Sequence, residues 1–386
     1  MRKDLGPARP LAWSEPGRTT LEIKTGGWRT QRPVYVEATA PCRSACPAGE
    51  PIARWIERAR AGDYAGAWAL IREENPFPAV TGRVCAHPCE SACNRAGYDG
   101  AVAIHTLERF VGEWGLSHGA ATPSAALKAE GVAIVGGGPA GLAAAYHLGR
   151  WGYRVAVFEA QPRLGGLLRY GIPEYRLPRA VLDGEIEMAL PPGVLISTGC
   201  CVGADVTWED LSAYDAVFLA TGAALPLRLD VPGERAKGVG DGLQFLSEVN
   251  AGKRPEMGER VVVVGGGSTA MDVARSARRL GVPSVTVLAL EEREVMPAAP
   301  EEVSQALAEG VEILNGVGVS AISEEEGLVR GVVMAAARLE RLAGGGVSPV
   351  FSGDKPVLRE ADAVLLAIGQ RPDLSALPFG IQSDGG

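Results

Sequence analysis

The feature that most constrains the fold is a glycine-rich segment that occurs twice in the sequence. The first copy reads Gly131-Val-Ala-Ile-Val-Gly-Gly-Gly-Pro-Ala-Gly141, and the second reads Arg260-Val-Val-Val-Val-Gly-Gly-Gly-Ser-Thr-Ala270. Each begins with an apolar, mostly β-branched run that predicts a buried parallel strand, and each continues into an alanine-rich helical pattern. A second strand is expected after each helix, at 153–158 and at 284–288. The sequence therefore predicts an α/β fold with two strand–helix–strand units.

Three glycines of the first copy have distinct tasks in a dinucleotide-binding turn. Gly136 permits the tight turn, Gly138 lets the backbone approach a pyrophosphate, and Gly141 lets the helix pack closely on the strand. The free N–H groups at the start of the helix then face the phosphates. Glu159 ends the second strand, where a carboxylate accepts hydrogen bonds from a ribose diol. This combination predicts a Rossmann-like nucleotide site; a glycine-rich turn in an ordinary α/β protein is the alternative.

The second copy repeats the pattern with Gly265, Gly267 and Ala270, and alanine is permitted at the third position. Two such sites in one chain imply two different nucleotides. A flavin paired with a nicotinamide is the usual chemical reason, because a hydride must pass between them. Hydride transfer requires no side-chain acid or base at its centre, so no catalytic side chain is predicted.

Most of the cysteines precede these units, and they run Cys42-x3-Cys46 and Cys85-x3-Cys89-x3-Cys93. Cysteines clustered in this way, without a recognisable export signal, indicate a metal site rather than disulfides. Thiolates suit iron–sulfur clusters or zinc, but no gap has the C-x2-C length most common in zinc sites. A proline follows Cys46, as in cluster-binding segments of bacterial ferredoxins. Buried cysteines without a metal are the alternative.

The region around these cysteines is predicted to be mostly helical, with the cysteines at loop ends. A helix is expected over 50–74, because apolar residues recur there with a helical period, and Asn75-Pro-Phe-Pro78 ends it. The segment 85–93 is expected to be a loop, and a further helix is expected to resume over 102–114. Farther along, the adjacent Cys200 and Cys201 are expected on a strand, packed in a core rather than active in redox chemistry.

Several longer motifs carry a specific resemblance to a known family. They are Cys42-x3-Cys46-Pro47, Asn75-Pro-Phe-Pro78, Gly82-Arg83-x-Cys85, Gly136-Gly-Gly-Pro-Ala-Gly141, Leu164-Gly-Gly-Leu-Leu-Arg-Tyr-Gly-Ile-Pro-Glu-Tyr-Arg-Leu-Pro178, Ala220-Thr-Gly222 and Ala367-Ile-Gly-Gln370. Through them the chain resembles the small subunit of glutamate synthase and the N-terminal half of dihydropyrimidine dehydrogenase, over roughly residues 41–373. In that family the first nucleotide site holds FAD and the second holds NADPH.

The resemblance implies which residues would contact the two nucleotides. Those implied for FAD are Gly136, Gly138, Pro139, Ala140, Gly141 and Glu159, with flavin-side contacts from Leu167 and Arg176. Thr221 and Gly222 mark the strand end at which the family's chain leaves the flavin domain. The residues implied for the nicotinamide nucleotide are Gly265, Gly267, Ser268, Thr269 and Ala270, with Ala367, Ile368 and Gly369 closing over it.

The family binds two [4Fe–4S] clusters in its N-terminal domain, and this sequence departs from that pattern. By the family's assignment, one cluster is held by Cys46, Cys85, Cys89 and a non-cysteine ligand whose position matches Glu108. The other cluster retains only Cys42 and Cys93, because the two cysteines that the family has upstream are absent. One cluster is therefore expected, and a second would need ligands from a partner. His87 lies within the cysteine loop and is either a further ligand or a spacer.

Domain limits and location follow from these assignments and from composition. At roughly 150 residues per domain, 386 residues predict two or three domains. The expected divisions are an extended arm (1–40), an α-helical iron–sulfur domain (41–120), an FAD-binding domain (129–250), an NAD(P)-binding domain (258–373) and the start of a return to the FAD domain (374–386). The family continues beyond this point with a segment that contacts the flavin, so the chain is expected to be a fragment; a flavin site completed in another way is the alternative.

Charge and hydropathy exclude two classes of partner. The net charge of −8 argues against nucleic acid or an anionic membrane surface. No uncharged apolar run outside the first glycine-rich segment approaches the roughly 18 residues that membrane insertion requires. The first residues form no apolar signal segment, so a cytoplasmic location is expected.

The family binds the 2′-phosphate of NADP through two adjacent basic residues just past the second strand of its second unit. Counted back from Met296, those positions hold Leu290 and Glu291 here. Leucine offers a phosphate no donor, whereas a carboxylate at this point usually accepts hydrogen bonds from a ribose diol. NAD(H) is therefore predicted as the nicotinamide nucleotide. Arg293 could instead swing in towards a phosphate, and Glu291 could belong to a solvated turn.

These features favour an electron-transfer subunit that exchanges a hydride between NAD(H) and FAD. Single electrons would pass between the flavin, the [4Fe–4S] cluster and a partner redox subunit. The loss of one cluster favours a partner such as a tungsten, molybdenum or iron–sulfur oxidoreductase. The alternatives are an NADPH-oxidising small subunit of glutamate synthase, a structural or relay subunit without flavin turnover, and a free-standing diaphorase.

Overall fold

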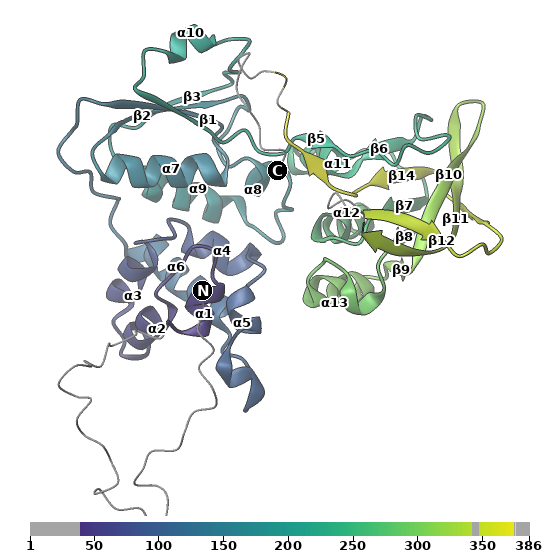
Figure 1. The fold of residues 1–386 in the computed structure, drawn as a ribbon, viewed down its shortest axis with the longest axis horizontal. Helices are drawn as coiled ribbons and strands as arrows, with labels where there is room; N and C mark the ends of the chain where they lie inside the picture. Colours follow the sequence, from purple (N-terminus) through teal and green to yellow (C-terminus); the bar gives the residue numbers. More distant parts are fainter. Residues whose placement is uncertain (1–38, 342–346, 374, 376–386) are drawn as a thin grey trace, which may run out of the picture. The chain divides into compact units, whose positions relative to one another are not determined.

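The fold is given by a computed structural model that describes residues 39–341, 347–373 and 375. Except for residues 39, 40 and 375, the arm predicted for 1–40 and the return segment predicted for 374–386 lie outside the described residues. The predicted α/β class with a helical N-terminal region is confirmed (Figure 1).

The N-terminal part is a group of short helices. They are α1 (Pro41–Ala45), α2 (Ile52–Arg60), α3 (Tyr64–Ile71), α4 (Pro78–Val84), α5 (Pro88–Ser91), the 3-10 helix η4 (Asn94–Gly97) and α6 (Ile104–His118). Trp55, Ile71 and Val111 are completely buried and join α2, α3 and α6 in one apolar core. These helices surround the cysteine-bearing segments.

Two of the local predictions for this region were wrong. The single helix predicted over 50–74 is broken at Gly62, which adopts a φ of 80°. Asp63 then caps the next helix by accepting a hydrogen bond from the Gly66 N–H at 2.9 Å. The segment 85–93, predicted to be a loop, contains α5, so Cys89 lies on a helical turn.

The first nucleotide-binding region contains a parallel sheet in the order β3-β2-β1-β4. Its strands are β1 (Gly131–Val135), β2 (Arg154–Glu159), β3 (Leu195–Thr198) and β4 (Ala216–Leu219). Helices α7 (Pro139–Arg150) and α9 (Arg179–Ala189) lie on one side and α10 (Trp208–Leu211) on the other, while α8 (Leu167–Tyr170) follows β2 (Figure 1). Cys200 and Cys201 come after β3 and are half-buried and exposed, so the prediction of a core position on a strand was wrong.

The second nucleotide-binding region has a parallel sheet in the order β6-β14-β7-β8-β9. The strands are β6 (Val239–Asp241), β7 (Arg260–Val264), β8 (Ser284–Leu288), β9 (Glu312–Leu314) and β14 (Ala363–Leu366). Helices α11 (Gly242–Asn250), α12 (Ser268–Arg279) and α13 (Pro300–Ala308) pack with it, and the 3-10 helix η5 (Arg293–Val295) follows β8. Both strand–helix–strand units predicted from the repeat are therefore present.

Antiparallel strands extend this second region. They are β10 (Val317–Glu325), β11 (Leu328–Arg341), β12 (Val347–Phe351) and β13 (Val357–Glu360), and a short pair joins β5 (Leu225–Pro226) to β15 (Gln370–Arg371). Ile322 and Val332 pack from β10 and β11 against Val262 and Val264 of the parallel sheet. The extension thus covers one face of the sheet, and α12 and α13 belong to the core on the other. Among the described residues, no helix combines the length and the apolar character needed to cross a bilayer.

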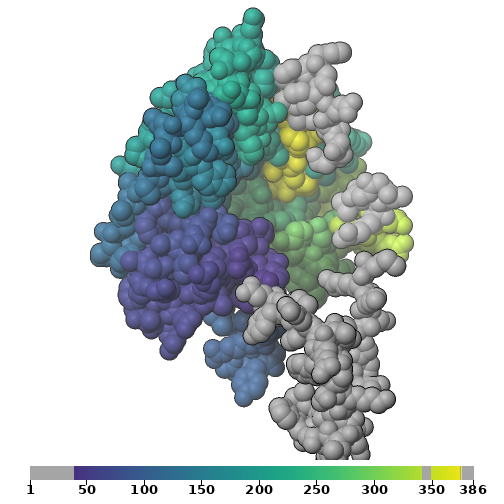
Figure 2. All heavy atoms as spheres, turned by 60° about the vertical axis from the view of Figure 1, so that its left-hand side comes forward, coloured from purple at the N-terminus to yellow at the C-terminus, as the bar shows by residue number. Residues whose placement is uncertain are grey.

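Buried polar contacts join the cysteine-bearing helices to the first sheet region. Glu185 on α9 is only 3% exposed, and its two carboxylate oxygens accept hydrogen bonds from the Ala79 and Val80 N–H groups, each at 2.8 Å. Those N–H groups belong to the first turn of α4, where only the Val80 N–H has a second acceptor, the Phe77 carbonyl at 3.1 Å. Arg72 also donates to the Met188 carbonyl at 3.0 Å. In Figure 2 the purple N-terminal helices lie below the blue and teal elements of the first sheet region.

Replacing Glu185 with alanine should destabilise the protein markedly. It leaves the buried Ala79 N–H without an acceptor, whereas the Val80 N–H keeps its bond to the Phe77 carbonyl at 3.1 Å, so a loss of about 1–3 kcal/mol is expected. Burial raises the pKa of Glu185 to about 8, while its two amide donors act in the opposite direction. Glu185→Gln keeps one acceptor and should lose less. Urea unfolding followed by tryptophan fluorescence measures the effect. The control is Glu187→Ala, which changes an exposed carboxylate on the same helix; equal stability of the two alanine variants would contradict the prediction.

Candidate functional site

The first glycine-rich turn links β1 to α7, and its glycines meet different demands. Gly136 has a φ of 108°, and a Cβ there would lie 2.3 Å from the Ala220 carbonyl oxygen. A Cβ on Gly141 would lie 1.9 Å from the Gly136 carbonyl oxygen. The protein itself therefore requires glycine at both positions. At Gly138 the atom nearest to the position that a Cβ would take is the Gly166 Cα at 3.8 Å, so the protein leaves open space there.

The open space at Gly138 fits the phosphates of a dinucleotide. Pro139 and Ala140 form the exposed first turn of α7, where backbone N–H groups lack partners within the helix. Glu159 is buried at the end of β2, where its Oε2 accepts from the Gly137 N–H at 2.6 Å and its Oε1 accepts from the Gln161 N–H at 2.7 Å. The carboxylate thus lies against the glycine-rich turn, at the position predicted for a ribose-binding acid.

The second turn reproduces this arrangement in detail. Gly265 has a φ of 137°, and a Cβ there would lie 2.3 Å from the Ala367 carbonyl oxygen. Around Gly267 no atom lies within 4 Å of the position that a Cβ would take. A Cβ on Gly266 would lie 2.4 Å from Oε2 of Glu291. Glu291 therefore lies beside the second turn as Glu159 lies beside the first.

The other residues predicted at the nicotinamide site surround this turn. Ser268 and Thr269 are half-buried in the first turn of α12, and Ala270 is fully buried behind them. Ala367 follows β14 directly and is buried, Ile368 packs against the core beside it, and Gly369 has a φ of 114°. The structure thus brings the predicted segments 265–270, 291 and 367–369 together.

The predicted flavin-side residues differ from one another in exposure and in their contacts. Leu167 begins α8 and is 45% exposed. Thr221 and Gly222 follow β4 and are exposed, and Gly222 has a φ of 71°. Arg176 donates to Asp272 Oδ2 at 2.5 Å and also pairs with Glu302. Its guanidinium therefore binds the second nucleotide-binding region, and its predicted contact with the flavin stays a prediction.

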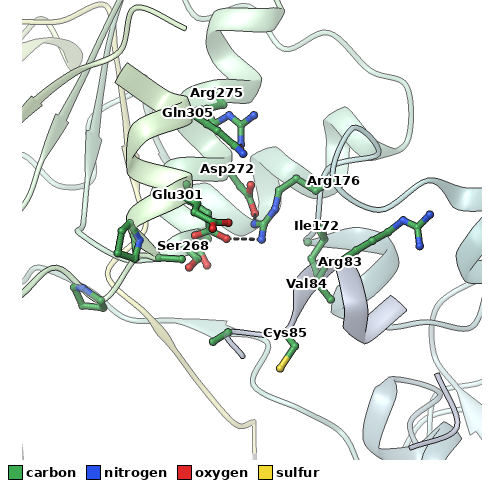
Figure 3. Close-up of a pocket in the computed structure, with 18 of the residues that line it drawn as sticks. Arg83, Val84, Cys85, Ile172, Arg176, Ser268, Asp272, Arg275, Glu301 and Gln305 are labelled. Carbon is green, nitrogen blue, oxygen red and sulfur yellow. Dashed lines mark hydrogen bonds and ion pairs between the residues drawn. The ribbon is translucent and has the colours of Figure 1, made fainter. Parts of the chain in front are cut away.

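A cavity of about 930 Å³ collects residues from all three regions of the chain (Figure 3). Cys85 lines it from the cysteine loop, Leu167 and Arg176 from the first sheet region, and Ser268 and Asp272 from α12. Figure 3 shows Arg176 pointing across the cavity towards Asp272, with Cys85 at another side. The geometry places a candidate cluster ligand, a predicted flavin-side residue and the second glycine-rich turn around one space.

Two carboxylates in this cavity carry atoms that a ligand could satisfy. Asp272 Oδ1 and Glu302 Oε2 are buried and have no hydrogen-bond partner within the described residues. Burial raises the pKa of Asp272 to about 7, and the neighbouring Arg176 guanidinium opposes that shift. The sequence analysis missed both residues. A signal existed for Asp272, because it lies one helical turn after Ser268 and so shares its face of α12.

The structure also brings the predicted cluster ligands together. Cys85 follows α4, Cys89 is buried on α5, and Cys46 packs against the same apolar core. Burial, followed by the charges of Cys85, Glu90, Cys46 and Glu108, raises the pKa of Cys89 to about 12. Thiolates crowded in this way repel one another unless a cation lies between them. The donor set therefore fits a cationic iron–sulfur core.

Glu108, the predicted non-cysteine ligand, is held by neighbouring polar groups. It is buried on α6, and its Oε1 accepts from Asn75 Nδ2 at 3.0 Å and from the Thr81 hydroxyl. Burial, followed by the charge of Glu50, raises its pKa well above the ordinary value. The motif Asn75-Pro-Phe-Pro78 thus supplies an amide that orients this carboxylate.

The other two cysteines of this region and two histidines lie around this group. Cys42 is half-buried on α1, and Cys93 precedes η4, where the N–H groups of Val102 and Arg95 lower its thiol pKa. His87 lies beside Glu90 and His105, an arrangement that the sequence analysis missed because His105 is distant in the chain.

Comparisons with known proteins agree with this geometry. Residues 130–385 match the family described as pyridine nucleotide-disulphide oxidoreductase, and residues 29–120 match dihydropyrimidine dehydrogenase domain II, 4Fe-4S cluster. The chain is 38% identical to the NADP(+)-dependent formate dehydrogenase subunit beta of Moorella thermoacetica, over 98% of this chain and 57% of that protein. It is 39% identical to the NADPH-Fe(3+) oxidoreductase subunit beta of Geobacter sulfurreducens, over 90% of this chain and 53% of that protein.

A third relative is covered more completely. The NAD-dependent dihydropyrimidine dehydrogenase subunit PreT homolog of Salmonella typhi is 37% identical over 74% of this chain and 70% of that protein. The chain spans about half the length of the first two relatives. Mycobacterium tuberculosis FprA in complex with NADPH shares the fold, with a TM-score of 0.53 and 20% identity over 63% of this chain and 71% of that one. The glycine-rich turns, the cysteine cluster and these matches together show that the chain belongs to the pyridine nucleotide-disulphide oxidoreductase family and carries a 4Fe-4S domain of the dihydropyrimidine dehydrogenase type.

Proposed function

We propose that this chain is an electron-transfer flavoprotein subunit that exchanges a hydride between NAD(H) and FAD and single electrons with a [4Fe–4S] cluster. The observation that carries the proposal is the shared cavity, which is lined by Cys85, Arg176 and the start of α12. A hydride donor, a flavin and a cluster need short separations, and one cavity between the three regions would supply them.

The residues of this chain would bind and orient the groups rather than react. The turn at Gly138 and the free N–H groups of α7 would hold the pyrophosphate of FAD, and Glu159 would bind its ribose. When bound, FAD supplies the conversion between two-electron hydride chemistry and single-electron transfer. The start of α12 would position the nicotinamide nucleotide at the cavity.

The proposed partner is another redox subunit. Two of the relatives are named as subunits beta, of a formate dehydrogenase and of an Fe(3+) oxidoreductase, which supports a role within a complex. A partner with a tungsten, molybdenum or iron–sulfur centre fits the proposal best, and a glutamate synthase large subunit is the second candidate.

Anaerobic reduction tests the proposal directly. NADH should bleach the visible flavin absorption of the purified protein, and an electron paramagnetic resonance signal of a reduced [4Fe–4S] cluster should follow. Bleaching without a cluster signal would contradict electron transfer between the two centres. Unchanged absorption with both NADH and NADPH, in protein that contains flavin, would contradict the oxidoreductase function and favour the structural or relay subunit.

The protein should contain one cluster, held by Cys46, Cys85, Cys89 and Glu108. Metal analysis should find about four irons per chain, as a single cubane requires. Cys89→Ser should lose most of this iron, because it removes a buried thiolate of the group. The matched control is Cys200→Ser in the first sheet region, which should keep the iron. About eight irons per chain would contradict the single cluster.

A further inference from the structure

A second group of metal-binding side chains lies beside the cysteine cluster. His87 precedes α5, Glu90 belongs to α5, and His105 lies in the first turn of α6. One ligand atom from each lies within 4.8 Å of the others. Two imidazoles and one carboxylate are a common ligand set for Zn²⁺, in which the fourth position stays open to water or another ligand.

The His87 ring is oriented as a metal ligand. Its Nδ1 lies 3.0 Å from the Cys85 carbonyl oxygen. A carbonyl only accepts hydrogen bonds, so Nδ1 donates, and in the neutral ring Nε2 is then the nitrogen with the free lone pair. Histidines that bind metals usually donate the other ring N–H to such an acceptor. The hydrogen bond that would orient a metal-binding imidazole is therefore already in place.

The free nitrogen of His87 faces a carboxylate oxygen at a distance that suits an ion. Nε2 lies 3.8 Å from Glu90 Oε2, which is too long for a hydrogen bond. Two ligands of one tetrahedral Zn²⁺ lie roughly 3.3 Å apart, given bonds of about 2.0–2.1 Å. A small movement of either side chain would close the difference.

The rest of the group is held in place by its own contacts. Glu90 Oε1 accepts from the His105 backbone N–H at 2.9 Å and lies 2.8 Å from His105 Nδ1. The rings of His87 and His105 stack with centroids 4.3 Å apart. An ion at this point would replace the hydrogen between His105 Nδ1 and the carboxylate. Because the two rings stack nearly parallel, at 17°, one ring would first turn so that the in-plane lone pairs of both face one ion.

The group is accessible from the cavity. His87 and His105 both line it, and the side chains of His87, Glu90 and His105 are 23%, 16% and 25% exposed. We propose that these three residues form a site for a divalent ion of the zinc type, separate from the cysteine cluster. The bound ion would link α5, which carries Cys89, to α6. It would also present its open coordination position to the cavity.

Zinc binding to the holoprotein, with its cluster and flavin in place, tests the site. Calorimetric titration with ZnCl2 should show one ion per chain. Zinc K-edge X-ray absorption should show only nitrogen and oxygen neighbours at about 2.0–2.1 Å, without the sulfur shell at about 2.3 Å that cysteine ligation gives. His105→Ala and Glu90→Gln should each weaken zinc binding at least tenfold with the iron content unchanged. Glu90→Gln is the conservative variant, because its amide oxygen can still accept from the His105 N–H.

The matched control is His118→Ala, which removes an exposed histidine at the other end of α6 and should leave zinc binding unchanged. A sulfur shell would place the zinc among the cysteines and overturn the proposal. Equal zinc affinity in His105→Ala and His118→Ala would also overturn it. Loss of iron together with zinc in both test variants would overturn it as well, because the three side chains would then only support the cysteine loop.

Discussion

Replacing Gly138 with valine is expected to remove FAD from the protein while leaving the chain folded. The backbone at Gly138 has a φ of −79°, which valine adopts without strain, and the protein leaves its Cβ position open. The new methyl groups would occupy the space at the start of α7 that the pyrophosphate requires. Flavin occupancy should fall at least tenfold, which corresponds to about 1.4 kcal/mol or more of lost binding. Flavin absorbance per chain after gel filtration measures it.

The two glycine-rich turns provide the control for each other. Gly267→Val introduces the same change at the second turn, where the Cβ position is equally open. It should keep the flavin and lose reduction by NADH, whereas Gly138→Val should lose the flavin itself. Gly141→Ala should instead impair folding, because its Cβ would lie 1.9 Å from the Gly136 carbonyl oxygen. Full flavin occupancy in Gly138→Val would contradict the assignment of FAD to the first turn.

Replacing Glu291 with arginine is expected to shift the preference of the enzyme from NADH towards NADPH. The Glu291 carboxylate lies against Gly266, as the Glu159 carboxylate lies against Gly137. A carboxylate there accepts hydrogen bonds from a ribose diol and repels a 2′-phosphate. The wild-type protein should prefer NADH by roughly tenfold or more in kcat/KM, since each ~1.4 kcal/mol is a factor of ten. Glu291→Arg should remove or reverse that preference.

The control for Glu291→Arg is Glu294→Arg, which makes the same change of charge at an exposed position in η5. It should leave the ratio of the two kcat/KM values unchanged. The other candidate for a phosphate contact, Arg293, directs its Nη2 towards the Ile313 carbonyl at 3.5 Å. Related chains are named for NADP as well as for NAD, so we expect the residue beside the second turn, rather than the family, to decide the preference. Equal or better turnover of the wild type with NADPH would contradict the prediction.

Features that depend on a single residue type were predictable from the sequence. The turns need glycine at Gly136 and Gly265, because each has a positive φ. A Cβ at either position would also collide with the carbonyl oxygen of the residue that follows a neighbouring strand. The same physical demand recurs in both units, so the repeat indicated both parallel sheets before any contact was known. The cysteine group was predictable for a similar reason, since few residues other than cysteine bind an iron–sulfur core.

Features that depend on tertiary contacts were not predictable. The helical period over 50–74 continues through Gly62, although the backbone turns there. The Arg176 pair with Asp272 joins residues that are far apart in the chain, and neither residue signals the other. The same holds for His87 and His105, whose rings meet only because α5 turns back towards α6. The exposure of Cys201 was missed because an apolar pattern does not reveal where a strand ends.

The hydrogen bonds of Glu185 to the start of α4 have a kinetic consequence. Helix α4 begins at that carboxylate and ends just before Cys85, so these buried hydrogen bonds hold the cysteine loop to the first sheet region. The second sheet region meets this part through the Arg176 ion pairs and through hydrogen bonds from Asn250 to the Tyr170 and Ile172 carbonyls, contacts that a hinge motion would have to break and remake. Such a motion would change the approach of the nicotinamide but not the path between the first glycine-rich turn and the cysteines. Electron tunnelling along that path would then be insensitive to solvent viscosity, whereas the hydride step would slow as viscosity rises.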